Sequence, residues 1–232
     1  MNTHHLDFNT ACAAEHPAAV PPLPSPAFAG TTVMLASNSP RRRELLGLIL
    51  PEFSIAPRRD IDEAYPSDLP PADVPAYLSR LKADAYADLL TPDTLLITAD
   101  TVVISERSES SEHSEFSESS KILGKPRSEA EACEMLRSLA GRTHTVVTGV
   151  TLRSGSGRRD ETFSETTRVT FGPLTDSEIA QYVARYRPLD KAGAYGIQEW
   201  LGAAAIARID GCFYNVMGLP LHALYRHLTA YF

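Results

Sequence analysis

The fold is decided by residues 33–50, which read Val-Met-Leu-Ala-Ser-Asn-Ser-Pro-Arg-Arg-Arg-Glu-Leu-Leu-Gly-Leu-Ile-Leu. The first five residues are a short, mostly apolar run that is typical of a buried strand, and the later leucines recur at the spacing of one helical face. Between the two runs, Ser39 is a candidate N-cap and Pro40 occupies the first helical turn, where proline is favoured. The segment therefore predicts a strand, a turn and a helix, the opening unit of an α/β protein.

Strand-like and helix-like segments alternate along the rest of the chain. Strand-like runs cover residues 94–104, 143–152 and 161–170, and the Ser-Gly-Ser-Gly turn at 154–157 predicts that the last two runs form a hairpin. Ala99-Asp100-Thr101 is expected to interrupt the first of these runs. Helices are predicted over residues 75–90, 128–139, 175–186 and 219–228. The predicted fold class is α/β, with a mixed central β-sheet flanked by helices in one domain that could comprise two lobes.

The overall composition excludes several classes of protein. The 232 residues carry 22 Lys and Arg against 29 Asp and Glu, a net charge of −7, whereas binding to nucleic acid relies on clustered basic residues that release counterions. No stretch of about 18 apolar residues and no secretory signal pattern are visible, so we expect a cytoplasmic protein with no membrane partner. The three cysteines show no metal-site spacing, which argues against structural zinc or a disulfide framework.

Two segments are expected to lie outside the core. Residues 1–30 are rich in Pro, Ala and His without periodicity, and we expect them to form a disordered N-terminal extension before a domain that spans 31–232. Residues 105–120 contain eight Ser and five Glu, and they bury too little apolar surface to offset the entropy of ordering. We expect this second segment to be a solvated insert between two ordered elements.

The turn that follows the first strand has the composition of a phosphate site. Ser37, Ser39, Arg41 and Arg42 surround a helix N-terminus, whose free backbone N–H groups attract anions. The turn is not a P-loop, because the GxxxxGK[ST] pattern is absent. The alternative is an ordinary N-cap beside solvent-exposed arginines.

An acidic group and two lysine-containing turns are further candidates. Asp100 lies within an apolar run, and a buried carboxylate needs a partner, a metal or a proton, although a turn at the end of a strand explains it equally well. Asp60, Asp62 and Glu63 lie in a loop before the helix predicted at residues 75–90. Glycines near Lys125 and within residues 190–198 allow close approach to a polyanion, whereas taken singly each is more often a turn with a solvated lysine.

Seven segments of the chain follow one another in a recognisable order and spacing. They are residues 35–46, Asp62-Glu63, 81–83, 99–103, Ile-Leu-Gly-Lys-Pro at 122–126, Asp-Lys-Ala-Gly-Ala-Tyr-Gly-Ile-Gln at 190–198, and 214–220. Together they resemble the Maf (septum-formation inhibitor) family of nucleoside triphosphate pyrophosphatases. The resemblance extends over about residues 32–230 and implies a mixed-sheet α/β fold, Mg²⁺ or Mn²⁺ as cofactor, and hydrolysis of a nucleoside triphosphate to its monophosphate and pyrophosphate.

The resemblance also implies roles for single residues. Asp100 matches the family's general base, and Arg41, Thr101 and Gln198 match positions linked to substrate choice. With the metal assigned to Glu63 and Asp100, the residues expected to bind substrate are Ser37, Ser39, Arg41, Arg42, Lys82, Thr101, Lys125, Lys191 and Gln198. The form of residues 190–198 is similar to the branch that acts on dTTP and UTP, although Glu199 stands where the family usually has Gly.

The base that the substrate carries follows from Gln198 in this interpretation. A Gln amide offers a donor and an acceptor that can pair with the O4 acceptor and the N3–H donor of uracil or thymine, provided that Thr101 or a backbone amide fixes it. One alternative is a house-cleaning pyrophosphatase for other non-standard nucleotides. Another is a regulator of cell division that senses nucleotides without turnover. The sequence leaves the oligomeric state open, with a homodimer as one alternative.

Overall fold

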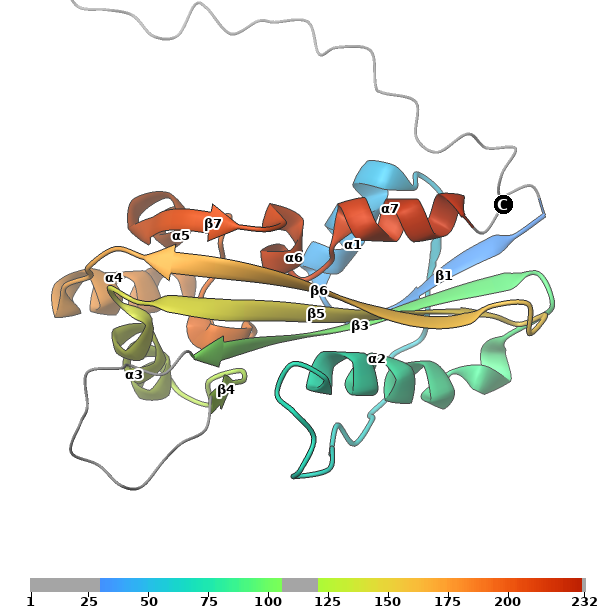
Figure 1. Ribbon diagram of the computed structural model, residues 1–232, viewed down its shortest axis with the longest axis horizontal. Coiled ribbons are helices and arrows are strands. Elements are labelled where there is room, and N and C mark those ends of the chain that lie inside the picture. The colour runs from blue at the N-terminus through green and yellow to red at the C-terminus, as the bar shows by residue number, and fades with distance from the viewer. Residues whose placement is uncertain (1–29, 106–120, 231–232) are drawn as a thin grey trace, which may run out of the picture.

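The computed structural model describes residues 30–105 and 121–230, which form one mixed β-sheet with helices on both faces (Figure 1). The strands are β1 (Thr32–Ala36), β2 (Ser54–Ile55), β3 (Thr94–Ser105), β4 (Lys121–Leu123), β5 (Thr143–Ser154), β6 (Asp160–Phe171) and β7 (Ile206–Asp210). The helices are α1 (Pro40–Ile49), α2 (Val74–Ala85), α3 (Glu129–Leu139), α4 (Asp176–Tyr186), α5 (Trp200–Ala205), α6 (Phe213–Met217) and α7 (Leu221–Thr229), with 3-10 turns η2 (Ala87–Leu89) and η3 (Ala192–Ala194). The predicted fold class is confirmed.

The sheet combines a parallel and an antiparallel part. Its strand order is β2-β1-β3-β5-β6-β7, and β4 pairs with the far end of β3. β1 runs parallel to β2 and β3, whereas the other pairs are antiparallel. The predicted hairpin is confirmed as β5 and β6, which pair from Thr143 opposite Thr170 to Arg153 opposite Asp160. The long strands β3, β5 and β6 therefore form the central ribbon on which all other elements pack.

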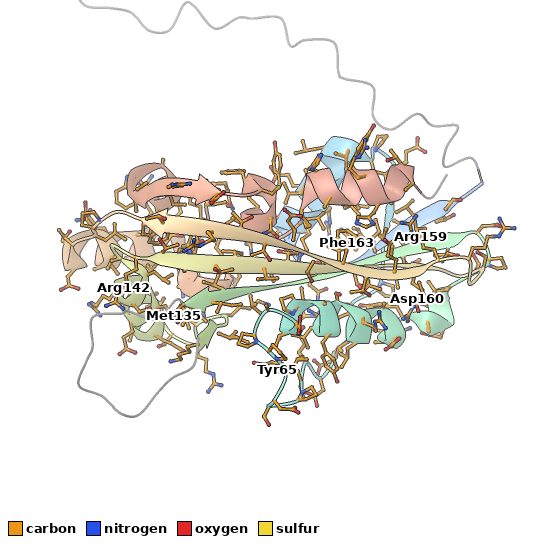
Figure 2. The ribbon with its side chains drawn as sticks, in the orientation of Figure 1. Tyr65, Met135, Arg142, Arg159, Asp160 and Phe163 are labelled. Carbon is orange, nitrogen blue, oxygen red and sulfur yellow. The ribbon has the colours of Figure 1, made fainter. Side chains whose placement is uncertain are left out.

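Apolar side chains attach the helices to both faces of this ribbon. α1, α6 and α7 lie on one face and α2 on the opposite face (Figure 1). Leucines from α1 and α7 pack on β1, β3 and β5, while α3 and α4 cover the other end of the sheet around Phe171 and Tyr182. Phe163, labelled beneath α7 in Figure 2, stacks on the His227 ring with centroids 3.8 Å apart. Among the described residues, no helix has the length and apolarity needed to cross a membrane.

The structure corrects two predicted boundaries. β3 is not interrupted at Asp100: it continues from Thr94 to Ser105, and Asp100 is paired with Gly149 in the middle of the strand. Ser105, assigned from sequence to the polar insert, is the last residue of β3 and pairs with Lys121 and His144. The rest of the predicted insert, 106–120, and residues 1–29 of the predicted extension lie outside the described residues.

Short elements and helix ends account for the other differences. α2 ends at Ala85, where the sequence predicted a helix to residue 90, because η2 follows it. Sequence reasoning did not find β4, β7, α5 or α6, which have three to six residues each. Elements this short carry too little periodicity to be recognised, so their formation depends on tertiary contacts.

The absence of a side chain at Gly149 lets α2 lie directly on the sheet. A Cβ atom at this position would lie 2.3 Å from the backbone nitrogen of Ala76 and 2.3 Å from the carbonyl carbon of Pro75. The helix is held in this position by the Thr98 hydroxyl, which donates to the carbonyl oxygen of Ser79 at 2.6 Å. Gly149 therefore sets the distance between α2 and the strand pair β3–β5.

We expect Gly149→Ala to destabilise the protein by about 1–3 kcal/mol, because the new methyl group overlaps backbone atoms that cannot rotate away. Chemical denaturation measures the loss. Gly47→Ala on α1 is the matched control, since a Cβ there meets nothing within 4 Å and alanine favours a helix. A Gly149→Ala variant as stable as the control would contradict the close approach of α2.

Candidate active site

A pocket opens where β3 changes its neighbour in the sheet. β1 pairs with β3 as far as Thr98, and β4 pairs with it from Val103 onward, so the described chain gives residues 99–102 no strand partner on that edge. The carboxyl end of β1 and the turn into α1 lie at this gap. Crevices at the carboxyl ends of strands are the usual ligand positions in α/β sheets. The cavity has a volume of about 630 Å³, the size of a small-molecule site.

The pocket is basic although the chain is acidic. Its lining includes seven Lys or Arg side chains and four Asp or Glu side chains, in a protein whose net charge is −7. The charged lining residues are Arg41, Arg42, Arg58, Arg59, Lys82, Lys125, Lys191, Asp60, Glu63, Asp100 and Asp190. Concentrated positive charge in a concave site attracts anionic ligands.

The turn between β1 and α1 is shaped by its two serines. Ser39 is the N-cap of α1 and accepts the backbone N–H of Arg42 at 3.4 Å, as predicted. The Ser37 hydroxyl accepts the backbone N–H of Ser39 at 3.2 Å. Both residues line the pocket together with Pro40. The positive end of α1 is therefore directed at the cavity.

Arg42 joins this turn to the unpaired edge of β3. Its guanidinium donates to the carbonyl oxygen of Ala99 at 2.9 Å, to that of Gly218 at 2.7 Å and to the Thr101 hydroxyl at 3.0 Å. Burial lowers the pKa of Arg42 from its ordinary value, and the nearby carboxylate of Asp100 acts in the opposite direction. Since its donors are directed at protein oxygens, Arg42 fixes the position of the strand that carries Asp100.

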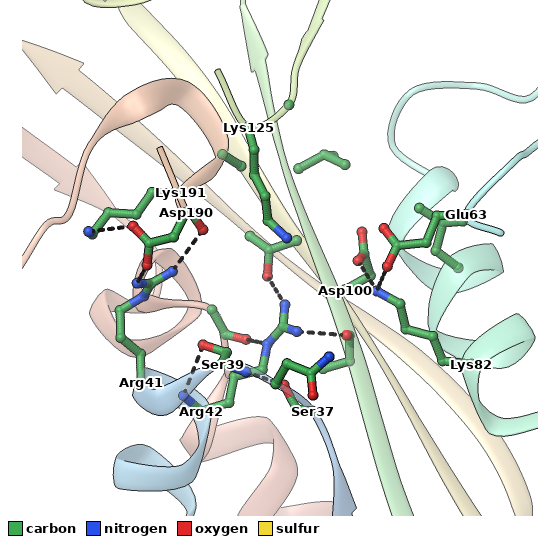
Figure 3. Close-up of a pocket in the computed structure, with 18 of the residues that line it drawn as sticks. Ser37, Ser39, Arg41, Arg42, Glu63, Lys82, Asp100, Lys125, Asp190 and Lys191 are labelled. Atoms are coloured by element: carbon green, nitrogen blue, oxygen red, sulfur yellow. Dashed lines mark hydrogen bonds and ion pairs between the residues drawn. The ribbon is translucent and has the colours of Figure 1, made fainter. Parts of the chain in front are cut away.

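Two carboxylates share one lysine on the α2 side of the pocket. Lys82 Nζ lies 2.5 Å from Asp100 Oδ1 and 2.9 Å from Glu63 Oε1 (Figure 3). The side chains of Lys82 and Asp100 are each 13% exposed, whereas that of Glu63 is 48% exposed. Three residues from separate segments, all named as site residues from the sequence, therefore meet at one point. Asp62 instead accepts the backbone N–H of Ala64 at 3.2 Å and does not line the pocket.

A second charged group lies across the pocket. Asp190 accepts a hydrogen bond from Arg41 at 2.5 Å and one from Lys191 at 2.8 Å (Figure 3). Partial burial alone would raise the pKa of Asp190, but the hydrogen bonds from Lys191 and Arg41 outweigh it, and the pKa lies below its ordinary value. The predicted residues Arg41 and Lys191 are thus brought together by Asp190, which belongs to the candidate motif at 190–198 but was given no role from the sequence.

Lys125 and Gln198 both line the cavity. Figure 3 shows Lys125 between the two charged groups. Lys125 and Gln198 are exposed, and no described residue forms a hydrogen bond or an ion pair with either side chain. The backbone N–H of Gly193 donates to the carbonyl oxygen of Gly124 at 3.1 Å, which joins the two turns that carry them. Thr101, expected as one way to fix the Gln198 amide, instead contacts Arg42 and the Thr148 hydroxyl at 2.9 Å.

Several lining residues were missed at the level of sequence. Arg58 is exposed and has no partner among the described residues, and Tyr65 lies on the same loop, on the α2 side of the sheet (Figure 2). Arg59 pairs with Asp88 at 2.6 Å. The Tyr195 hydroxyl lies 2.7 Å from His144 Nε2. For the loop that carries Arg58, Arg59 and Tyr65, the signal in the sequence was the group of acidic residues within 60–63.

Comparison with known proteins identifies the family of the chain. The model of the family described as Maf-like protein matches residues 32–231. The chain belongs to this family. The Maf-like match includes all the lining residues described above.

Curated Maf-like relatives carry one recurrent name. A protein of Porphyromonas gingivalis named dTTP/UTP pyrophosphatase is 50% identical over 200 residues, which cover 84% of this chain and 92% of that protein. Proteins of the same name from Bacteroides thetaiotaomicron and Carboxydothermus hydrogenoformans are 45% and 46% identical over 196 residues, covering 84% of this chain and 94% and 96% of theirs. The solved Ham1 protein of Staphylococcus aureus matches 61% of this chain and 72% of its own at 17% identity, with a TM-score of 0.40, too low to carry an argument.

We expect Lys82→Met to lower the free energy of unfolding by about 2–4 kcal/mol, because it leaves the buried Asp100 carboxylate without its cation. In an Asp100→Asn background the same substitution should cost much less, and chemical denaturation of the four proteins gives the coupling. Asp88→Asn is the control, since that carboxylate lies in an exposed pair and should change stability little. Equal costs of Lys82→Met in both backgrounds would contradict the pairing.

Proposed function

We propose that this chain is a nucleoside triphosphate pyrophosphatase that hydrolyses dTTP and UTP to the nucleoside monophosphate and pyrophosphate. Curated relatives of that name are 42–50% identical to it. The observation that carries the proposal is the placement of Asp100, a nearly buried carboxylate in the middle of a strand, at the floor of a pocket with a net positive lining. Binding alone needs positive charge, whereas turnover also needs a group that accepts a proton from water.

The phosphates are assigned to the groups around the turn into α1. The N-terminus of α1 offers backbone N–H groups, and Lys125 and Arg58 are cations without a described protein partner. The charge of a triphosphate, about four negative units, is offset best where such cations are not already paired. Arg41, Lys82 and Lys191 add further positive charge, although each already contacts a carboxylate.

A divalent cation is part of the proposal, and the residues present fit one. Glu63 and Asp100 direct carboxylate oxygens at a single point, where Lys82 Nζ lies. Mg²⁺ prefers oxygen ligands and commonly takes one or two carboxylates together with substrate phosphates and water. Among the described residues no group of three or more His, Cys, Asp or Glu could hold a metal. The two carboxylates would therefore hold Mg²⁺ or Mn²⁺ jointly with the triphosphate, and the ion would neutralise phosphate charge.

Asp100 is assigned the role of general base. It accepts a proton from a water molecule, the water oxygen forms a bond to the α-phosphorus, and the bond from that phosphorus to the α,β-bridging oxygen breaks. Pyrophosphate leaves with the electron pair of the broken bond, and the nucleoside monophosphate remains. Arg42 supports this step by fixing β3 through the Ala99 carbonyl group, so that the carboxylate does not shift as charge moves.

The proposal also covers the binding partner, the cellular compartment and the oligomeric state. The partner is a small nucleotide and not a nucleic acid, because basic residues gather in a cavity within an acidic chain. We assign the protein to the cytoplasm, where such nucleotides are available. A homodimer is the alternative to a monomer, and light scattering of the purified protein decides between them.

Pyrophosphate should be released from UTP and dTTP in the presence of Mg²⁺ and not in the presence of EDTA. Asp100→Asn keeps the shape of the side chain but removes its basicity, so kcat should fall about 10²-fold or more. Asp62→Asn is the matched control, since that aspartate is exposed and lies outside the pocket lining. Nucleoside diphosphate and orthophosphate as the first products would refute attack at the α-phosphorus.

We expect Gln198→Ala to lower kcat/KM for UTP and dTTP more than for CTP. The difference in activation free energy between CTP and the other two nucleotides should shrink by about 1–3 kcal/mol. The physical reason is that the amide pairs with O4 and N3–H of uracil and thymine, whereas cytosine presents the reverse pattern. Steady-state kinetics with the three nucleotides measures the change. Equal losses for all three would show that Gln198 supports its loop and does not contact the base.

A further inference from the structure

Glu199 occupies an N-cap position without acting as a helix cap. It precedes α5, yet its side chain makes no capping hydrogen bond to that helix. A carboxylate at an N-cap ordinarily accepts a backbone N–H of its own helix. The Glu199 carboxylate instead contacts two residues from other parts of the chain: Lys191 Nζ lies 3.1 Å from Oε1, and the Tyr182 hydroxyl donates to Oε2. The Glu199 carboxylate therefore binds Lys191 and Tyr182 in place of a backbone N–H of α5.

Tyr182 extends this contact to the loop that carries Gln198. Its hydroxyl oxygen accepts the backbone N–H of Gly196 at 3.0 Å. Tyr182 is 1% exposed in α4 and its ring stacks on Tyr186, so the hydroxyl has one fixed place. Burial, together with the hydrogen bond to Glu199, raises the pKa of Tyr182, so the hydroxyl keeps its proton and remains a donor. The order of contacts is thus Gly196 to Tyr182 to Glu199 to Lys191.

The Glu199 carboxyl group also packs against the backbone of Gly196. A Cβ atom at Gly196 would lie 2.7 Å from Glu199 Cδ and 2.9 Å from Oε2. The backbone N–H of Glu199 donates to the carbonyl oxygen of Gly196 at 3.0 Å, which closes the turn. Gln198 lies inside this turn and lines the pocket, whereas Glu199 does not line it. Any effect of Glu199 on a ligand must therefore pass through its neighbours.

On the basis of the proposed function, we propose that Glu199 is a positioning residue that determines base specificity. It holds the turn at 196–198 against Tyr182 and the ammonium group of Lys191, so that Gln198 meets the base in one orientation. A Gln amide distinguishes uracil from cytosine only when it cannot flip, because the flipped amide presents the reverse pattern. Glu199 supplies this restraint without contacting the substrate.

The test compares substitutions that keep or remove the acceptor at this position. Glu199→Ala should lower the UTP to CTP ratio of kcat/KM about tenfold, because it removes the acceptor of the Tyr182 hydroxyl and the partner of Lys191. Tyr182→Phe should do the same, because it removes the hydroxyl that accepts the Gly196 N–H and donates to Glu199. Glu199→Gln retains one acceptor oxygen, which can serve the Tyr182 hydroxyl, but it lacks the second oxygen that contacts Lys191. The ratio should therefore fall about twofold to threefold, less than in Glu199→Ala. Glu134→Gln, at an exposed position on α3 outside the pocket, is the matched control and should change nothing.

Three results would overturn the proposal. A variant that is merely less folded loses kcat for every nucleotide by one factor, so an unchanged ratio in Glu199→Ala shows a structural role alone. A loss in Glu199→Gln as large as in Glu199→Ala shows that charge, not position, is responsible. A wild-type protein that binds neither UTP nor CTP analogue overturns both this proposal and the proposed function.

Binding measurements separate the two proposals when turnover is absent. Calorimetry with the α,β-imido analogues of UTP and CTP reports discrimination without hydrolysis. Wild-type protein that binds the UTP analogue but releases no pyrophosphate from UTP contradicts the proposed activity alone. The ratio of the two dissociation constants should still fall about tenfold in Glu199→Ala, and an unchanged ratio contradicts the role of Glu199.

Discussion

The backbone of α2 touches the sheet at Gly149, and the chemistry of the pocket depends on that contact. Gly149 is paired with Asp100 across β5 and β3, so the helix lies closest to the sheet where the acidic residue emerges. Lys82 extends from the same helix, and its Nζ lies 2.5 Å from Asp100 Oδ1. A larger residue at 149 would separate the lysine from the strand, and a buried carboxylate without its cation is costly. The packing of α2 and the ion pair of Asp100 therefore both depend on Gly149 having no side chain.

The gap in the sheet that creates the pocket also leaves backbone groups to be satisfied. On the edge that faces β1 and β4, β3 has no described strand neighbour beside residues 99–102, and Arg42 supplies a hydrogen bond to the Ala99 carbonyl oxygen there. The same side chain reaches Thr101, whose hydroxyl contacts Thr148, which in turn donates to the carbonyl oxygen of Asn215. Such buried polar networks favour one arrangement because a partly formed network leaves groups unpaired. The pocket floor is thus held by one network that joins α1, β3, β5 and α6.

The sequence predicted the features that depend on residues close together in the chain, and it missed those that depend on distant residues. The turn at Ser39 and Pro40 was predicted correctly, because capping depends on neighbours within three residues. The continuity of β3 through Asp100 was not, because it depends on a glycine 49 positions away that pairs with it. The candidate site residues were found by their motifs, and the structure brings them to one cavity. Glu199 was visible only as a departure from the family pattern, since its partners belong to other elements.

The pairing of charges inside the pocket bears on which ligand the site accepts. Five of its seven basic side chains already contact protein carboxylates or carbonyl oxygens, which leaves Lys125 and Arg58 without a described partner. A bare triphosphate of about four negative charges exceeds two free cations and would have to break internal ion pairs, whereas a complex with one divalent ion carries about two negative charges and matches them. Under the proposed function, the charge balance therefore favours a triphosphate that arrives with its metal, and Glu63 and Asp100, both beside Lys82, are the carboxylates that we propose would share that ion.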